Sequence, residues 1–183
     1  MTGEAQWPAW ATERVEVHPP DDAWQRSGEQ ERRRLDAVLA AWLVAPVEHV
    51  GSTAVPGLAA KPILDLQAAV DHLGCGSDIA AVLARCGWHA VPPPLDGRPW
   101  RRLFVKVEGG RRVAHLHLLL RTHPRWGQQL LFRDALRADA ELARRYAAVK
   151  LALAERHAHD REAYTAGKAA FIAAILDEHD QHL

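Results

Sequence analysis

The sequence predicts an α/β (α+β) fold, in which a mixed sheet with helices is followed by a C-terminal helical lobe. Two observations carry this prediction. Segments of strand-like and helix-like periodicity alternate over residues 27–122, and only helical periodicity remains over residues 123–183. The length of 183 residues suits one domain with an appended lobe. Residues 1–26, which are rich in tryptophan and proline, are expected to be irregular.

The first predicted helix begins at Ser27, which forms a capping-box pattern with Gln30. Its apolar face follows helical spacing through Leu35, Val38, Leu39, Trp42 and Leu43. Pro46 is expected to end this helix, because proline cannot donate the next backbone hydrogen bond. Before the helix, Val15–Val17 is expected to form a short edge segment at most.

Two strands with a long loop between them are predicted next. Val47–Val50 forms the first strand, residues 51–62 form a loop of turn-forming residues, and Ile63–Val70 forms the second strand. Because side chains alternate along a strand, Asp65 and Gln67 are expected on the same face.

The rest of the predicted sheet follows a helix that Ser77 is expected to cap, with Cys86 on its buried stripe. Residues 92–97, with three consecutive prolines, are expected to form an exposed loop. The further strands are Trp88–Val91, Trp100–Val107 and Arg112–Leu120. Glu108-Gly109-Gly110-Arg111 predicts a hairpin turn between the last two of them.

The lobe is predicted to contain helices with apolar stripes from Trp126 onward. Asp139 is expected to cap the second of them and Asp160 the third. The third helix is expected to carry Tyr164 and Phe171 on its apolar stripe.

Composition excludes several classes of protein. Lys+Arg and Asp+Glu number 23 each, so strong nonspecific binding to nucleic acid is not expected. Two cysteines are too few for a disulfide scaffold. No apolar run reaches the roughly 20 residues of a membrane span, and the N-terminus lacks a signal-peptide pattern. A cytoplasmic protein without nucleic-acid or membrane partners is the expectation.

The loop after the first strand carries the strongest functional pattern. Gly51, Ser52 and Thr53 can present backbone N–H groups and a hydroxyl to an anion, and Lys61 adds positive charge. A carboxylate on the next strand, Asp65, can hold a metal ion beside a bound phosphate. This layout is typical of the nucleotidyltransferase fold. The alternative is a plain tight turn.

His115 and His117 alternate on one strand, so both rings are expected on one face. They either share a pocket with Asp65 and Gln67 or lie on a solvent-facing strand. In a shared pocket, one of them can act as general base or as a metal ligand. Of Arg101 and Arg102, which alternate along the preceding strand, at most one is expected to face that pocket.

Cations of the lobe are candidates for phosphate contacts. Arg133 and Arg137 are neighbours at i and i+4 on one helix, and Lys150 follows Tyr146 at the same spacing. The alternative for the arginines is a surface ladder of salt bridges that includes Asp134. Tyr146 is expected to be a core residue rather than a ligand contact.

Residues 49–67 resemble the signature of the GrpB family, which belongs to the nucleotidyltransferase-fold superfamily. The resemblance continues through Trp100–Phe104, His115–His117, Leu131–Arg137, Tyr146–Lys150 and Tyr164–Ile172. It also extends to a domain that is fused behind dephospho-coenzyme A kinase in some bacteria. The resemblance implies the nucleotidyltransferase-like sheet and a lobe that helps to bind nucleotide or acceptor.

The active-site pattern of that superfamily is only partly present. The resemblance implies a carboxylate at position 65, a second at 67 and a third on a later strand, whereas this chain has Asp65, the neutral Gln67 and the His115/His117 pair. One carboxylate is too few for two Mg²⁺ ions, and imidazole favours Zn²⁺, Mn²⁺ or another transition metal. A transferase with one ion (Mg²⁺ or Mn²⁺), a transition-metal site and a metal-free pocket therefore remain open.

Three functional hypotheses follow. In the first, the protein transfers a nucleotidyl group from a nucleoside triphosphate to a small-molecule acceptor with a divalent metal, held by Asp65 and His117. In the second, it is a non-catalytic module that binds a nucleotide or another phosphorylated small molecule at a degenerate metal site. In the third, it is an interaction protein with a vestigial cleft.

Overall fold

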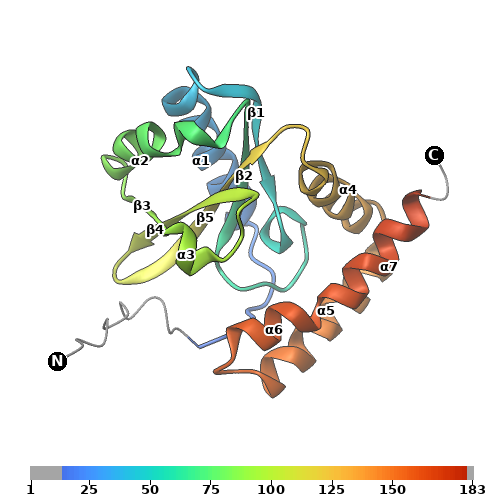
Figure 1. Ribbon diagram of the computed structural model, residues 1–183. Coiled ribbons are helices and arrows are strands. Elements are labelled where there is room, and N and C mark those ends of the chain that lie inside the picture. The colour runs from blue at the N-terminus through green and yellow to red at the C-terminus, as the bar shows by residue number, and fades with distance from the viewer. Residues whose placement is uncertain (1–13, 181–183) are drawn as a thin grey trace.

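The computed structural model describes residues 14–180, with side chains to residue 178. Its centre is a five-stranded mixed sheet in the order β1-β2-β5-β4-β3 (Figure 1). The strands are β1 (Leu43–Val50), β2 (Leu64–Val70), β3 (Trp88–Ala90), β4 (Arg101–Glu108) and β5 (Arg111–Leu120). β2 and β5 are parallel, and the other neighbours are antiparallel. The predicted hairpin between β4 and β5 is confirmed.

The two faces of the sheet pack against different helices. On one face, Leu35 of α1 (Ala23–Leu39) and Ile79 of α2 (Gly76–Ala84) join Leu66 and Leu116 of the central strands in the main core. On the other face, Trp126 of α4 (Pro124–Ala138) packs against Ala69 and Leu119. Asp65 and the histidines of β5 lie on this second face, which is the one towards the lobe.

The first helix begins and ends earlier than predicted. Because α1 starts at Ala23, Ser27 lies inside the helix, and the predicted capping box is wrong. The helix ends at Leu39, so Trp42 and Leu43 are not on its face, and Pro46 lies within β1. Pro46 is tolerated there because β1 is an edge strand, where a missing N–H costs no ladder bond.

Other local predictions also need correction. α2 begins at Gly76 with Cys75 at its N-cap, so Ser77 is not the cap. Because α2 ends at Ala84, its buried stripe does not reach Cys86, which is exposed rather than buried. The loop at residues 92–97 contains a one-turn helix, α3 (Pro93–Asp96), and a 3-10 turn, η3 (Leu73–Cys75), precedes α2.

Near the N-terminus, residues 1–13 of the predicted irregular segment lie outside the described residues. Instead of an edge segment at Val15–Val17, His18 forms a single antiparallel bridge with Ala60.

The lobe consists of α4, α5 (Ala140–Arg156), α6 (Arg161–Gly167) and α7 (Ala169–Asp180). The predicted caps are confirmed, because the side chain of Asp139 accepts hydrogen bonds from the backbone at the start of α5 and Asp160 does so for α6. The single third helix of the prediction is two helices, which meet at Lys168.

The segment between β1 and β2 joins the sheet to the lobe. Val55 and Leu58 of this segment are buried in the apolar cluster of the lobe with Leu136, Tyr146 and Ile175. The mixed sheet and the helical lobe of the predicted fold class are therefore confirmed. Within the described residues, no helix combines the length and the apolar character needed to cross a membrane.

Candidate functional site

A carboxylate and two imidazoles meet on the face of the sheet that points to the lobe. Asp65 of β2 lies directly beside His115 of the parallel strand β5, and Gln67 lies beside His117. Oδ1 of Asp65 is 3.0 Å from Nδ1 of His115 and 3.7 Å from Nε2 of His117. The strand pairing thus brings Asp65 together with both histidines, which is the shared-pocket alternative of the two that the sequence left open.

The surroundings keep Asp65 ionised. Burial raises the pKa of its carboxyl group, but hydrogen bonds from His115 and His117 outweigh burial and hold the pKa well below its usual range. For His117, burial lowers the pKa more than the contact with Asp65 raises it. The cluster is therefore an anionic carboxylate beside a His117 ring that favours its neutral form.

Each histidine also contacts an arginine on its other nitrogen. Nη1 of Arg101 lies 2.6 Å from Nδ1 of His117, and Nη2 of Arg161 lies 3.4 Å from Nε2 of His115. Arg101 is in turn bound through two of its nitrogens by the carboxylate of Asp96. Arg101 is thus the one of the two neighbouring β4 arginines that reaches the cluster, and Arg161 brings the first turn of α6 to it.

The turn after β1 closes over Asp65. Gly51 has φ +70°, and a Cβ atom on it would lie 2.7 Å from Oδ2 of Asp65. Only glycine combines this backbone conformation with so close an approach. The 3-10 turn η2 (Ser52–Ala54) follows directly. Gly51 and Ser52 therefore lie where the sequence predicted an anion-binding turn, next to the carboxylate.

Thr53 has a different position from the one expected of a phosphate contact. Its side chain is buried, and its hydroxyl donates to the carbonyl of Ile63 and contacts Nε2 of His49 at 3.0 Å. The side chain of Gln25 donates to its carbonyl oxygen. Thr53 thus fastens the turn to β1 and α1.

Three lysines and two tyrosines pack together where the end of the loop meets the lobe. Nζ of Lys61 is 5.1 Å, and Nζ of Lys168 is 4.6 Å, from the centre of the Tyr164 ring. Nζ of Lys150 lies 4.8 Å from the centre of the Tyr146 ring and donates to the carbonyl of Ala59. Tyr146 is buried, as predicted.

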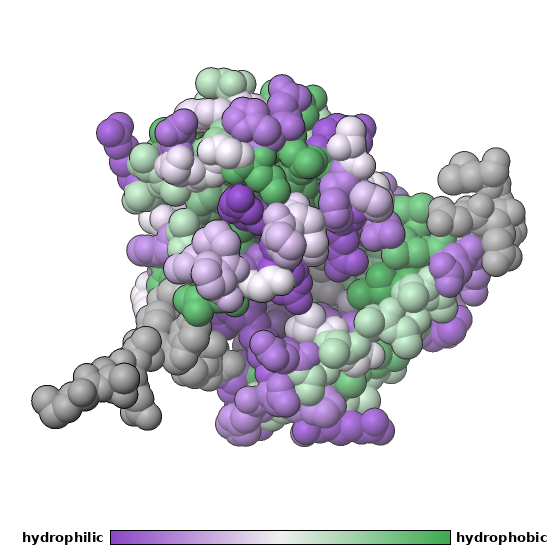
Figure 2. Space-filling view, viewed as in Figure 1, coloured by the Kyte–Doolittle hydropathy of each residue, from purple (hydrophilic) through white to green (hydrophobic). Residues whose placement is uncertain are grey.

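The lysines are close enough to influence one another. Burial, and then the charges of Lys168 and Lys61, lower the pKa of Lys150 to about 7. Burial also lowers the pKa of Lys168, against the opposing effect of Asp65. The three lysines thus lie near one another at the junction between the sheet and the lobe, and Lys168 also interacts with the Asp65 carboxylate. Figure 2 shows the surface hollowed between these two parts of the molecule.

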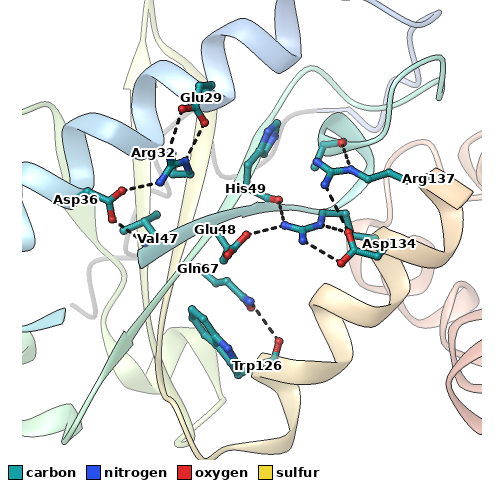
Figure 3. Close-up of polar contacts among 12 residues, drawn as sticks. Glu29, Arg32, Asp36, Val47, Glu48, His49, Gln67, Trp126, Asp134 and Arg137 are labelled. Atoms are coloured by element: carbon teal, nitrogen blue, oxygen red, sulfur yellow. Dashed lines mark hydrogen bonds and ion pairs between the residues drawn. The ribbon is translucent and has the colours of Figure 1, made fainter. Parts of the chain in front are cut away.

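Gln67 is on the predicted face, but its side chain contacts α4 and not the Asp65 cluster. It is fully buried, and its side-chain nitrogen donates to the carbonyl of Trp126 at 3.2 Å (Figure 3). Its side-chain oxygen has no hydrogen-bond partner among the described residues. Gln67 therefore connects β2 to the start of α4.

Arg133 and Arg137 of α4 lie beside the edge strand β1 and the turn that follows it. Figure 3 shows Arg137 next to Asp134. Arg133 pairs with Glu48 at 2.7 Å and with Asp134 at 2.8 Å, and it donates to the carbonyl of His49. Arg137 donates to the carbonyl of Ala54 at 3.0 Å. These contacts agree with the salt-bridge alternative for both arginines. Arg137 also holds the turn Ser52–Ala54 through its hydrogen bond to Ala54.

A polar pocket of 240 Å³ lies at this edge, apart from the Asp65 cluster. Its lining comes from α1, β1 and α4: Gln25, Glu29, Arg32, Glu48, His49, Arg133 and Arg137. Its arginines are bound by carboxylates of the protein itself, as Arg32 is by Glu29 and Asp36. The positive charges that line the pocket are thus already paired with carboxylates of the protein.

The ligand set of the cluster fits one metal ion and not two. One ligand atom from each of Asp65, His115 and His117 lies within 4.8 Å of the others. Two imidazoles and one carboxylate suit Zn²⁺, Mn²⁺ or a similar ion better than Mg²⁺. The next position on this face of β2 is the neutral, buried Gln67, which offers no carboxylate to a second ion.

Sequence reasoning missed Asp96, Arg125 and Arg161 as neighbours of the cluster. Asp96 lies in a segment expected to be an exposed loop, yet it holds Arg101. Arg161 directly follows the helix cap Asp160, so the sequence could predict that it begins α6. The sequence could not predict that this end of α6 packs against His115. Burial, and then the charges of Arg101 and Arg98, lower the pKa of Arg125 at the start of α4.

The fold and the site define an α+β protein with a carboxylate–imidazole cluster between a mixed sheet and a helical lobe. Residues 14–178 match the family described as GrpB protein. The chain therefore belongs to the GrpB family, and the family predicted from its motifs is confirmed.

Relatives and a solved structure agree with this assignment. A UPF0157 protein of Pseudomonas aeruginosa is 39% identical over 93% of this chain and 70% of its own length. The crystal structure of the conserved protein GrpB from Enterococcus faecalis has a TM-score of 0.78 and 30% identity, and the match covers 89% of this chain and 96% of that one.

Some relatives are much longer than the matching region. The UPF0157 protein YqkA of Bacillus subtilis is 33% identical over 87% of this chain, which spans 45% of that relative. A dephospho-CoA kinase of Mycolicibacterium paratuberculosis is 30% identical over 84% of this chain and 43% of its own length. The chain thus corresponds to less than half of each of these two proteins.

Proposed function

We propose that this chain is a nucleotidyltransferase-like protein that binds a phosphorylated small molecule, such as a nucleotide, between its sheet and its lobe. The observation that supports this most is a group of cations at the junction of the sheet and the lobe. Lys168 interacts with the carboxylate of Asp65, Arg161 contacts His115 beside it, and Lys61 shares the Tyr164 ring with Lys168. A phosphate group placed among these cations would offset their mutual repulsion and would bind the charge-assisted donors. Ser52, which follows Gly51 in the turn next to Asp65, would offer a backbone N–H and a hydroxyl to such a ligand.

Nucleotidyl transfer is the reaction that we propose for this site. An acceptor hydroxyl would attack the α-phosphorus of a nucleoside triphosphate, the new P–O bond would form, and pyrophosphate would leave. The hydroxyl proton would pass to His115 or His117, the imidazoles beside Asp65. A divalent ion held by Asp65 and one of the two histidines would neutralise charge on the phosphates when bound, which leaves the other histidine to accept the proton. The convergence of these three side chains favours this reaction.

A non-catalytic binding module is the second candidate. The buried position of Gln67 favours it, because this position cannot supply the second carboxylate of a two-metal site. The cations of the lobe would then hold a phosphorylated ligand without turnover. Both candidates share the ligand class and differ in the chemistry at Asp65.

The ligand class is tested by thermal shift and calorimetry of the purified chain. The probes are the four nucleoside triphosphates, coenzyme A precursors and sugar phosphates, each with Mg²⁺, Mn²⁺, Zn²⁺ or a chelator. A ligand at about 100 times its Kd adds roughly 2.7 kcal/mol of stability. Lys168→Met should weaken binding about tenfold, whereas Arg111→Met, at the exposed hairpin, should leave it unchanged. Equal affinities of the two variants, or no binding of any probe, would refute the proposal.

Transfer is distinguished from simple binding with α-labelled triphosphates and a mixture of small hydroxyl acceptors. Metal-dependent labelling of an acceptor that is lost in Asp65→Asn supports nucleotidyl transfer. Tight binding without release of pyrophosphate supports the binding module instead.

A further inference from the structure

Each histidine beside Asp65 lies between that carboxylate and an arginine. His117 has Oδ1 of Asp65 at 3.7 Å from Nε2 and Nη1 of Arg101 at 2.6 Å from Nδ1. His115 repeats the arrangement, with Asp65 at 3.0 Å from Nδ1 and Arg161 at 3.4 Å from Nε2. Each ring thus lies between a carboxylate and a guanidinium group.

The direction of the hydrogen bond to His117 follows from the chemistry of arginine. A guanidinium group has only donors, so Nδ1 of His117 must be the acceptor. In the neutral ring the proton is then on Nε2 and faces Asp65. Arg101 is well fixed in this role, since Asp96 binds its Nε and Nη2 and its side chain is only 9% exposed.

Metal ligation by Nε2 requires the opposite arrangement. The nitrogen that binds the metal must offer its lone pair, so the proton of a neutral ring moves to Nδ1, which normally donates to a carboxylate or a carbonyl oxygen. In this structure that proton would point at the N–H of Arg101, and two donors would face each other. His117 can therefore bind a metal ion only if the guanidinium of Arg101 moves.

We propose that Arg101 and a metal ion compete for His117, and that Arg101 is a positioning residue that keeps this metal site latent. The inference rests on the proposed metal site of Asp65, His115 and His117. It adds that the site has a protein-borne competitor, which Asp96 anchors. Metal affinity of the resting protein is consequently set by the Arg101–His117 contact as well as by the ligands.

The test is a titration of the full chain with Co²⁺, followed by its visible absorption bands, and with Zn²⁺ by calorimetry. Arg101→Met should bind Co²⁺ roughly tenfold or more tightly than wild type, because a charged hydrogen bond no longer opposes ligation. Arg102→Met is the matched control on the same strand. Its guanidinium donates to the carbonyls of Pro99 and Arg101 instead, so Co²⁺ affinity should not change. Arg101→Lys, which keeps a donor, should lie closer to wild type.

Two further measurements make the result decisive. Asp96→Asn removes the charge that anchors Arg101 while Arg101 stays in the chain, and it should also raise Co²⁺ affinity. This second variant keeps the test possible if Arg101→Met does not fold. Equal Co²⁺ affinity in wild type, Arg101→Met and Asp96→Asn would overturn the inference, as would absence of binding in all three. Nucleotide binding in the presence of chelator tests the proposed ligand class separately. Failure of the competition between Arg101 and the metal ion therefore does not imply failure of the proposed function, and the reverse also holds.

Discussion

At the scale of single residues, the position of Asp65 depends on the absence of a side chain at Gly51. The backbone there has φ +70°, and a Cβ atom would meet Oδ2 of Asp65 at 2.7 Å. Gly57, in the same loop, has φ +73° with nothing within 4 Å of a Cβ atom. Both glycines therefore require positive φ, but only at Gly51 would a Cβ atom also collide with another group. Comparing substitutions at the two positions separates the effect of backbone strain from the effect of this collision.

Gly51→Ala should lower the free energy of unfolding more than Gly57→Ala. Strain at positive φ costs on the order of 1–3 kcal/mol in either variant, and only Gly51→Ala also displaces a carboxylate. Urea denaturation of both variants measures the difference. Phosphate-ligand affinity should fall in Gly51→Ala alone, and equal effects of the two substitutions would contradict this account.

His49 gives the protein a pH-dependent stability. Burial lowers its pKa to about 4, against an unfolded value of about 6.5. Between these pH values the unfolded chain binds more protons, so the free energy of unfolding falls as the pH is lowered through this window, by up to roughly 3 kcal/mol. His49→Gln keeps a donor for Thr53 and should show a shallower fall between pH 6.5 and 4 in denaturant titrations. An unchanged slope would contradict the prediction.

At the scale of elements, the edge strand β1 is protected by side chains. The backbone N–H of Val47 donates to Oδ1 of Asp36 at 2.7 Å (Figure 3). The carbonyl of His49 accepts from Arg133, and Pro46 has no N–H. An edge strand with free N–H and C=O groups is a template for pairing with other chains. The charged residues at this edge therefore serve the fold, which explains why Arg133 does not point into the cluster.

Asp36→Ala should destabilise the protein by about 1–3 kcal/mol, because Val47 is buried and its N–H would lose its acceptor. Asp36→Asn keeps an acceptor oxygen and loses the charge that pairs with Arg32, so it is the matched control. Chemical denaturation measures both, and light scattering should detect self-association in Asp36→Ala alone. Equal stabilities of the two variants would show that the charge, and not the acceptor, is what matters.

At the scale of the whole molecule, the loop at residues 51–62 couples the lobe to the sheet. Leu58 is 2% exposed within the apolar cluster of the lobe, while Gly51, at the start of the same loop, lies against Asp65. Arg137 of α4 also holds the carbonyl of Ala54. The loop thus connects the apolar core of the lobe directly to the turn beside the candidate site.

Leu58→Ala should cost about 2–5 kcal/mol, the usual effect of truncating a buried leucine, and should leave one cooperative transition. Leu95→Ala, at a position 53% exposed, should cost less than about 0.5 kcal/mol. Unfolding in urea, followed both by far-ultraviolet circular dichroism and by tryptophan fluorescence, checks this. Separate transitions for the two signals would mean that the lobe unfolds on its own.

The sequence by itself determined the features that depend on local periodicity. Alternation along a strand placed Asp65 and Gln67 on one face and His115 and His117 on another strand's face, and aspartates marked the starts of α5 and α6. The motifs were also sufficient to identify the family. These features follow from backbone geometry over a few residues, which the order of side chains expresses directly.

The tertiary structure alone decided which neighbours surround those residues. The pairing of β1 with β2, the ion pair of Arg133 with Glu48 and the contact of Arg101 with His117 join residues far apart in the chain. Helical spacing shows which residues share a face, but not the surface on which that face packs. Leu58, for example, is buried because the lobe packs against the loop. Burial of apolar surface is not directional, so the surface against which a face packs depends on the whole molecule.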